Sequence, residues 1–209
     1  MKRPRLLDLF CGAGGAAMGY HRAGFDIVGV DFKPQPRYPF AFVRADALRP
    51  PFRLDDFDAI HASPPCQAYA ITNNIWKKPE SYPDLVAPTR AMLVESGLPW
   101  VIENVPGAPL NNPAVLCGEM FGLRVIRHRL FETRDLVLWP DHSAHTARAS
   151  YGRTPKHGEH YTIFGHFGDV VGARKAMDIA WMTRDELSQA IPPAYTEFIG
   201  RQLLQVVTL

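Results

Sequence analysis

Short apolar runs alternate with helical or glycine-rich stretches through the first half of the chain. Residues 6–10 form the first apolar run, and a glycine-rich turn leads from it into a helical pattern at 16–23. Four further runs have the length and composition of buried parallel strands; they are 25–30, 41–44, 58–62 and 100–103. Strands and helices that alternate in this way predict an α/β fold with a doubly wound, mostly parallel sheet.

The pattern changes in the second half of the chain. Segments 125–132 and 136–139 are extended in character on either side of a polar turn, which predicts a β-hairpin. Residues 140–174 are rich in His, Gly, Arg and Ser and have little periodicity. We therefore expect a short, irregular, loop-dominated insertion within residues 133–182.

Periodicity returns in residues 183–209 and predicts two helices there. Thr183 and Glu186 have the spacing of a capping box, in which both side chains satisfy backbone donors at a helix start. A pair of prolines at 192–193 ends this first helix. Apolar residues then recur on one face of a second, amphipathic helix: Tyr195, Phe198, Ile199, Leu203 and Val206.

Composition narrows the picture only slightly. A chain of 209 residues that is 46% apolar can bury one core, so we expect a single domain over 1–209. The formal net charge of +2 neither indicates nor excludes nucleic-acid binding. Three cysteines without framework spacing and the lack of a membrane-length apolar run favour a soluble cytoplasmic protein with no membrane partner.

The glycine-rich turn at 8–15, Asp-Leu-Phe-Cys-Gly-Ala-Gly-Gly, is the first candidate binding element. Glycines there permit a tight turn and close approach of a ligand to backbone amides. Asp31 ends the next strand and can accept from ribose hydroxyls, and Asp46 ends the third and can reach an adenine amino group. The pattern predicts a nucleotide-type site, and it equally fits a dinucleotide site or a structural turn beside two helix caps.

Reactive side chains follow two other strands. Cys66 comes after strand 58–62 and Glu103 ends strand 100–103, so both are expected at the carboxyl edge of the sheet beside the glycine turn. Arg127 and Arg129 are two residues apart on an extended segment, which would point both guanidiniums to one side. The alternatives are a cysteine that is a small buried apolar residue and an arginine pair on a solvated strand.

Five motifs in order make a specific resemblance. They are 8–15, Pro65-Cys66-Gln67, Glu103-Asn104-Val105, Arg127-x-Arg129 and Gln189-Ala-Ile-Pro-Pro193. In this order, across nearly the whole chain, the sequence resembles the cytosine C5 DNA methyltransferase family. The resemblance implies the Rossmann-like fold of S-adenosylmethionine-dependent methyltransferases and double-stranded DNA as substrate.

The resemblance also implies residue roles. Cys66 would be the nucleophile that adds to carbon 6 of cytosine, Glu103 would hold N3 and the exocyclic amine, and Arg129 would hold O2. Arg127 would support the region around Cys66. Nine residues would surround S-adenosylmethionine: Phe10, Gly12, Gly14, Asp31, Phe32, Asp46, Pro65, Gln189 and Ile191.

Chemistry on both faces of a cytosine requires the base to leave the duplex, and segment 68–78 is the expected closing loop. Its Asn, Trp and Lys residues suit phosphate contacts and filling of a vacated stack, and a solvated loop with one packed Trp fits as well. Residues 133–182 replace most of the family's recognition region. We therefore expect short or relaxed sequence specificity, and leave open a partner or second copy that supplies recognition surface.

Two positions depart from the family pattern. Val125 stands where a Gln is usual, and Gln189 stands where an Asn is usual. Both changes leave Cys66, Glu103 and Arg129 in place, so an active enzyme is the favoured interpretation. The compact size suits a phage or mobile-element enzyme of the restriction-modification type, acting in a bacterial or phage-infected cell.

Other functions fit parts of the pattern. The same chemistry on RNA or single-stranded DNA would not need a large recognition region. A catalytically silent nucleic-acid-binding homologue would leave Cys66 and Glu103 without a purpose, and a nicotinamide-dependent oxidoreductase would leave the same residues unexplained. His142-x2-His145 and His157-x2-His160, with Cys117 upstream, could be combined into a zinc site, but without a CxxC partner we expect no metal.

Overall fold

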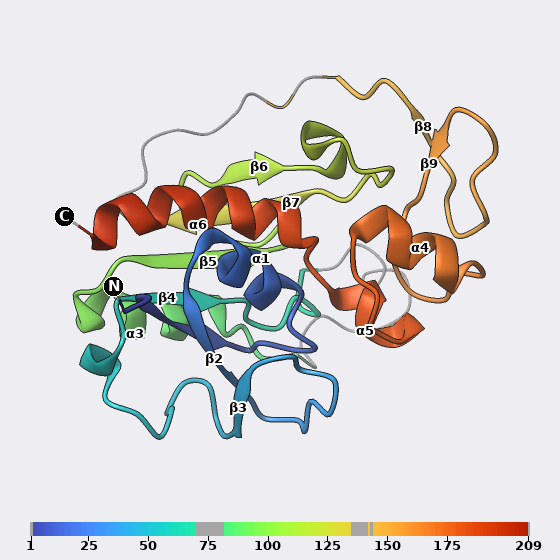
Figure 1. Cartoon of the computed structure of the whole chain (residues 1–209). Helices are drawn as coiled ribbons and strands as arrows, with labels where there is room; N and C mark the ends of the chain where they lie inside the picture. The colour runs from blue at the N-terminus through green and yellow to red at the C-terminus, as the bar shows by residue number, and fades with distance from the viewer. Residues whose placement is uncertain (1, 70–81, 135–141, 143, 209) are drawn as a thin grey trace.

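The computed structural model describes residues 2–69, 82–134, 142 and 144–208, and its centre is a seven-stranded sheet with the strand order β3-β2-β1-β4-β5-β7-β6 (Figure 1). Five strands are parallel neighbours: β1 (Arg5–Leu9), β2 (Asp26–Asp31), β3 (Ala41–Arg44), β4 (Ala59–Ala62) and β5 (Trp100–Asn104). All five lie where the sequence pattern predicts them. The doubly wound, mostly parallel sheet is thereby confirmed.

The predicted hairpin is wrong in its pairing. Strand β7 (Arg129–Thr133) pairs antiparallel with β5 on one side and with β6 (Ala114–Leu116) on the other. Segment 136–139, the expected partner, lies outside the described residues. The tertiary pairing prevails because β7 buries Phe131 beside β5, while β6 has three residues and no periodicity that a sequence pattern could detect.

Successive residues of β1 point to opposite faces of the sheet and supply two cores. Leu6 packs on the face covered by α1 (Gly15–Ala23) and α6 (Pro193–Val207), and Leu7 packs on the other face with Leu93 of α3 (Val86–Ser96) (Figure 1). Burial on both faces explains why these strands are continuous apolar runs. Helix α3 had no sequence prediction, because its apolar residues do not gather on one face.

The second half of the insertion is more ordered than the sequence predicts. After the short strands β8 (Arg148–Ala149) and β9 (Glu159–His160), helix α4 (Val170–Met177) begins where the Asp169 carboxylate accepts from the Gly172 amide at 2.8 Å. Helix α5 (Arg184–Gln189) follows and has the predicted capping box. A third core holds this region against the glycine turn and the segment before β7; it includes Ala13, Val125, Ile163, Phe167, Ala173, Met177, Met182 and Leu187.

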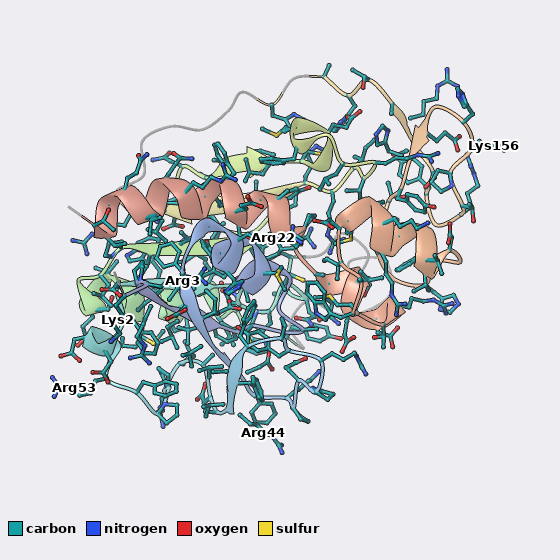
Figure 2. All side chains as sticks on the ribbon, in the orientation of Figure 1. Lys2, Arg3, Arg22, Arg44, Arg53 and Lys156 are labelled. Carbon is teal, nitrogen blue, oxygen red and sulfur yellow. The ribbon has the colours of Figure 1, made fainter. Side chains whose placement is uncertain are left out.

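The remaining described elements are two short 3-10 helices, η1 (Leu54–Asp56) and η3 (Gly118–Phe121). No helix in the described ranges is long and apolar enough to cross a membrane. The basic side chains of Arg44, Arg53 and Lys156 project from separate edges of the molecule (Figure 2). Charge distribution at these positions therefore does not mark a nucleic-acid surface.

Glycines allow α1 and α6 to touch through their backbones. A Cβ added at Gly19 would lie 2.1 Å from both the Pro193 carbonyl oxygen and Thr196 Oγ1, and one added at Gly200 would lie 2.7 Å from the Ala23 Cβ. The Thr196 hydroxyl donates to the Ala16 carbonyl at 2.8 Å across the same contact. The C-terminal helix is thus held at a distance that larger residues would forbid.

Gly19→Ala should destabilise the protein by about 1–3 kcal/mol through overpacking. The sign of this change in stability is informative, because Ala in place of Gly normally stabilises a helix interior by about 1 kcal/mol. Gly168→Ala is the matched control, since a Cβ there would meet no described atom within 4 Å. Urea unfolding of both variants measures the difference, and equal stabilities would contradict the close contact.

Asp8 on β1 should make stability depend on pH. The Tyr38 hydroxyl donates to its Oδ2 at 3.1 Å, and burial raises the pKa of Asp8 from 3.8 to about 8. The folded state therefore holds a proton that the unfolded chain releases near pH 4. Stability then falls as the pH rises from 3.8 to about 8, by up to about 1.4 kcal/mol per pH unit. Asp8→Asn should flatten the dependence of the free energy of unfolding on pH, measured by urea unfolding at several pH values. An unchanged dependence would assign it to another titrating group.

Candidate active site

A cavity of about 690 Å³ lies at the carboxyl ends of the parallel strands, a volume typical of small-molecule sites. Its wall is formed by the loops that follow β1, β2, β3, β4 and β5, together with Arg129 of β7 and the turn between α5 and α6. Open α/β sheets bind ligands at this edge because the loops after neighbouring strands converge there. Eight of the nine residues assigned to a cofactor line it: Phe10, Gly12, Asp31, Phe32, Asp46, Pro65, Gln189 and Ile191.

Gly14 is the exception. A Cβ added at Gly14 would lie 2.8 Å from Pro39 Cδ and 3.0 Å from the Tyr38 ring, so this residue faces the segment after β2 and does not line the cavity. Gly15 is part of the lining instead, and a Cβ there would lie 2.4 Å from the Ile191 carbonyl oxygen. The glycine run therefore serves two packing contacts as well as the cavity.

Gly12 presents open backbone to the cavity. Its φ is +49°, a conformation that favours glycine, and a Cβ added there would meet no atom of the described chain within 4 Å. The Gly12 amide donates to Asp31 Oδ2 at 3.0 Å, and the Lys33 amide donates to Oδ1 at 2.9 Å. Backbone amides therefore fix the Asp31 carboxylate at the cavity wall, as the Leu48 amide does for Asp46 at 2.9 Å.

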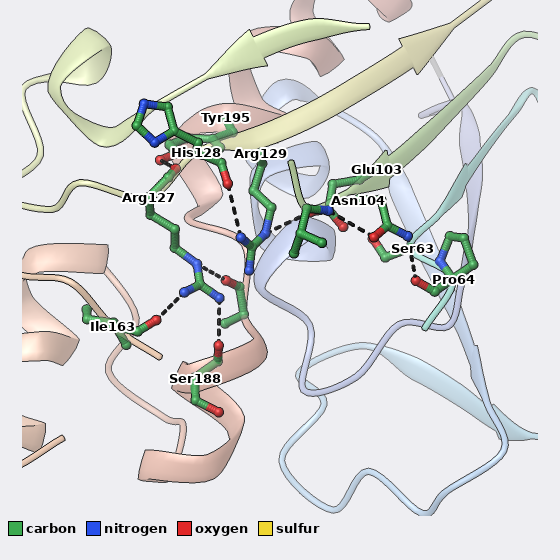
Figure 3. Close-up of polar contacts among 12 residues, drawn as sticks. Ser63, Pro64, Glu103, Asn104, Arg127, His128, Arg129, Ile163, Ser188 and Tyr195 are labelled. Carbon is green, nitrogen blue, oxygen red and sulfur yellow. Dashed lines mark hydrogen bonds and ion pairs between the residues drawn. The ribbon is translucent and has the colours of Figure 1, made fainter. Parts of the chain in front are cut away.

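Cys66, Glu103 and Arg129 line the same cavity. Arg129 Nε lies 2.8 Å from Glu103 Oε1, and both side chains are largely buried (Figure 3). Burial raises the pKa of Glu103, while Arg129 opposes that shift. Burial also raises the pKa of the Cys66 thiol, Arg129 and then Arg127 favour the thiolate, and Glu103 disfavours it. The three groups are electrostatically coupled.

A polar chain that the sequence analysis did not identify supports this cluster. The Ser63 hydroxyl hydrogen-bonds Glu103 and lies 2.9 Å from His61 Nε2, and His61 Nδ1 lies 3.0 Å from the Tyr20 hydroxyl. Burial lowers the pKa of His61 to about 3, so the imidazole is neutral. The only sequence signal for His61 is a polar residue inside an apolar strand.

Asn104 holds the loop that carries Cys66. Its side-chain Nδ2 donates to the Pro64 carbonyl at 2.9 Å, and its Oδ1 accepts from the Val105 amide at 2.9 Å (Figure 3). Strand β5 thus positions the segment after β4, two residues before the cysteine. This contact gives the Asn of the Glu-Asn motif a positioning role.

Arg127 does not line the cavity, and its guanidinium shares no partner with that of Arg129. It donates to the carbonyl oxygens of Ala190 and Ser188, both at 2.8 Å, and to that of Ile163 (Figure 3). Its own carbonyl accepts from the Tyr195 hydroxyl at 2.7 Å. Burial, and then Arg129, lower the pKa of Arg127 to about 9. Arg127 therefore ties the α5–α6 turn to the site, and it is Arg129 that faces the cavity.

The expected closing loop at 68–78 lies outside the described residues except for Ala68 and Tyr69. Of the two departures from the family pattern, Gln189 lines the cavity. Val125 is fully buried and forms a parallel bridge with Tyr161 of the insertion. Val125 thus belongs to the core that attaches the insertion.

No protein-family model and no curated protein matches the sequence. Solved structures do match the fold. A protein described as a DNA modification methyltransferase encoded within an E. coli prophage aligns with a TM-score of 0.67 and 14% identity, over 99% of this chain and 100% of that one. The Entamoeba histolytica methyltransferase EhMeth gives 0.61 and 13%, over 99% of each chain.

The S. pombe Dnmt2 methyltransferase gives a TM-score of 0.62 at 12% identity over 100% of both chains. At identities this low, the likeness shows the fold alone, and the chemistry must be argued from the site. The chain has the Rossmann-like methyltransferase fold that these three structures share.

Proposed function

We propose that this chain methylates carbon 5 of cytosine in DNA, with S-adenosylmethionine as methyl donor and Cys66 as a covalent nucleophile. One observation carries the proposal: a single cavity is lined both by the glycine turn with Asp31 and by Cys66, Glu103 and Arg129. A nicotinamide-dependent oxidoreductase would need the first set and leave the second without a role. The shared methyltransferase fold favours the same choice.

The cavity fits the methyl donor. Open backbone at Gly12 allows close approach of a ligand, and the oriented carboxylates of Asp31 and Asp46 suit ribose hydroxyls and an adenine amino group. Phe32 lines the cavity and is 72% exposed, so its ring face is free to stack on a purine. When bound, S-adenosylmethionine supplies an electrophilic methyl group on a sulfonium.

Cys66 makes the cytosine reactive. Its thiolate adds to carbon 6, and the electron pair of the 5,6 double bond becomes available at carbon 5, which takes the methyl group. A base then removes the proton from carbon 5, the double bond re-forms, and Cys66 leaves as a thiolate. Burial protonates the resting thiol, so the positive charge of Arg129 is needed to stabilise the thiolate that attacks.

Glu103 holds the ring during this addition. Negative charge develops at N3 when the thiolate adds, and a carboxylic acid can donate a hydrogen bond there. Burial of Glu103 favours the acid form, while the ion pair with Arg129 favours the carboxylate. Binding of the cytosine O2 by Arg129 would weaken that ion pair and shift Glu103 toward the acid when substrate is present.

The small insertion supports relaxed specificity. Its described second half, from β9 to α4, packs into a core with Val125 and Ala13, which attaches it to the glycine turn and to the segment before β7. Little of it is left to reach base edges in a major groove. The same feature favours a second candidate, cytosine C5 methylation of RNA or single-stranded DNA, where bases are already accessible.

Methyl transfer from labelled S-adenosylmethionine to duplex DNA, single-stranded DNA and tRNA tests both candidates. We expect 5-methylcytosine in duplex DNA, in many sequence contexts, and its loss in Cys66→Ala. The variant should still bind S-adenosylmethionine within a few-fold of wild type by calorimetry, which shows that it is folded. Label in RNA alone would select the second candidate, and label in no substrate would reject the enzyme assignment.

A covalent adduct is a separate readout of the role of Cys66. DNA with 5-fluorocytosine should trap the protein in a complex that survives denaturation, because the fluorine at carbon 5 cannot leave as a proton does. Cys66→Ser should form no such complex. Methylation that continues in Cys66→Ser, or trapping that is unaffected, would contradict a covalent route through this thiol.

Arg127→Met should weaken S-adenosylmethionine binding and lower stability by about 1–3 kcal/mol, because buried carbonyls of the α5–α6 turn lose their donor. Arg153→Met is the control, since Arg153 pairs with Glu159 at the surface. Calorimetric binding and urea unfolding report the two effects. A variant with lost turnover but unchanged cofactor affinity would instead place Arg127 in the chemical step.

A further inference from the structure

Four metal-ligating side chains converge outside the cavity. They are Cys117, His128, His142 and His145, and one donor atom from each lies within 4.8 Å of the others. The four come from three segments: Cys117 from the start of η3, His128 from the approach to β7, and His142 and His145 from the insertion. In Figure 3 the His128 imidazole points away from the guanidiniums of its neighbours Arg127 and Arg129, so this cluster is distinct from the proposed active site.

The imidazole nitrogens are spaced like ligands of one ion. His128 Nε2 lies 3.2 Å from His142 Nε2 and 3.0 Å from His145 Nε2. Zinc–nitrogen bonds of about 2.0–2.1 Å in a tetrahedral arrangement place two nitrogens about 3.3 Å apart. The same Nε2 atom of each ring faces the same point, which packing of aromatic rings alone does not require.

Protons alone do not satisfy these nitrogens. His145 Nδ1 hydrogen-bonds the Glu119 carboxylate, which leaves its Nε2 facing His128 Nε2. An imidazole nitrogen has one in-plane direction for a proton or a lone pair, so His128 Nε2 can form a good hydrogen bond with only one of His142 and His145. The second nitrogen–nitrogen contact is then left without a hydrogen bond. A cation at the centre would accept all three lone pairs.

The surroundings are those of a metal site. A ligating histidine usually hydrogen-bonds a carboxylate through its far nitrogen, which orients the ring, and Glu119 contacts His145 in this way. Glu119 is itself fixed by the Thr146 hydroxyl at 2.9 Å and the Ala147 amide at 3.2 Å. Cys117 is fully buried, and backbone amides, among them that of Arg127, donate toward its sulfur.

We infer that Cys117, His128, His142 and His145 form a structural Zn²⁺ site. One thiolate and three imidazoles suit Zn²⁺ among the common cations. Four protein ligands leave no coordination position for a substrate, so the site is structural. The ion would join the insertion to η3 and to the segment between the two arginines, and so hold the insertion beside the catalytic edge.

This proposal revises the sequence expectation of no metal. Only one of the two histidine pairs contributes, because His157 is exposed and lies outside the cluster, and His160 lies 4.0 Å from Glu119 without joining the four. His128 is the remaining ligand of the proposed site. In sequence it is hidden inside the Arg-x-Arg motif, and only the fold brings it to residues 117, 142 and 145.

Metal content of the full-length protein, purified without chelator or affinity metal, is the first test. We expect about one Zn²⁺ per chain by elemental analysis. Replacement with Co²⁺ should give the visible bands of a tetrahedral ion and a near-ultraviolet thiolate-to-metal band. Cys117→Ser should remove the thiolate band, and His145→Ala should lower the zinc content well below one per chain.

Two further variants separate a site from general damage. Glu119→Gln should weaken zinc binding by about 10–100-fold while leaving the four ligands in place. His157→Ala is the matched control and should keep full zinc content. Zinc should also raise the unfolding temperature of wild type and not of His145→Ala.

The outcomes are decisive and do not depend on methyl transfer. A metal-free protein that takes up neither Zn²⁺ nor Co²⁺ when it is reconstituted under reducing conditions would overturn the proposal. So would zinc content that is the same in wild type, Cys117→Ser and His145→Ala. Tight binding of another metal with a different geometry would reject zinc and the structural role, while the methylation assays would stand on their own.

Discussion

The backbone contact between α1 and α6 is the constraint on which the site depends. Gly19 and Thr196 let the last helix lie directly on the helix that follows the glycine turn, and Gly15 receives the Ile191 carbonyl just before α6 begins. A chain segment from the far end of the sequence therefore completes the wall of a cavity that the first strands open. Arg127 secures the same segment from the other side by binding the Ala190 and Ser188 carbonyls. The cavity is closed by tertiary contacts and not by any one motif.

Burial sets the electrostatics within that cavity. Glu103 and Cys66 both have pKa values raised by desolvation, and Arg129 and then Arg127 oppose both shifts; of these two cations, Arg129 lines the cavity. Two groups that share one counter-charge respond together when a substrate engages it. The neutral His61 and the Ser63 hydroxyl hold Glu103 without adding charge, so Arg129 keeps this control.

The insertion has two attachments of different kinds. Its later part is an apolar core with Val125, Ile163 and Met177, which holds α4 and α5 near the cavity. Its earlier part meets the sheet through the cluster of Cys117 and three histidines. A short polar segment has too few apolar residues to order itself by burial, and a coordinated ion is the usual substitute in small, weakly hydrophobic regions.

The sequence by itself determined the parallel strands β1 to β5, helix α1, the capping box of α5 and the amphipathic α6, because each has a local pattern of apolar positions or caps. It also brought the glycine turn, Asp31, Asp46, Cys66 and Glu103 to one edge, since loops after parallel strands must meet there. The other cavity residues, among them Arg129, Gln189 and Ile191, were named only through the family resemblance. It missed α3, α4 and β6, whose helical or strand character comes from packing.

Only the tertiary structure decided the pairing of β7, the inward role of Gly15 in place of Gly14, and the separate partners of Arg127 and Arg129. It alone joined His128 to residues 117, 142 and 145. These features depend on contacts between segments far apart in the chain. A periodicity or a motif records the environment of neighbouring residues, and it holds no information on which distant segment supplies the partner.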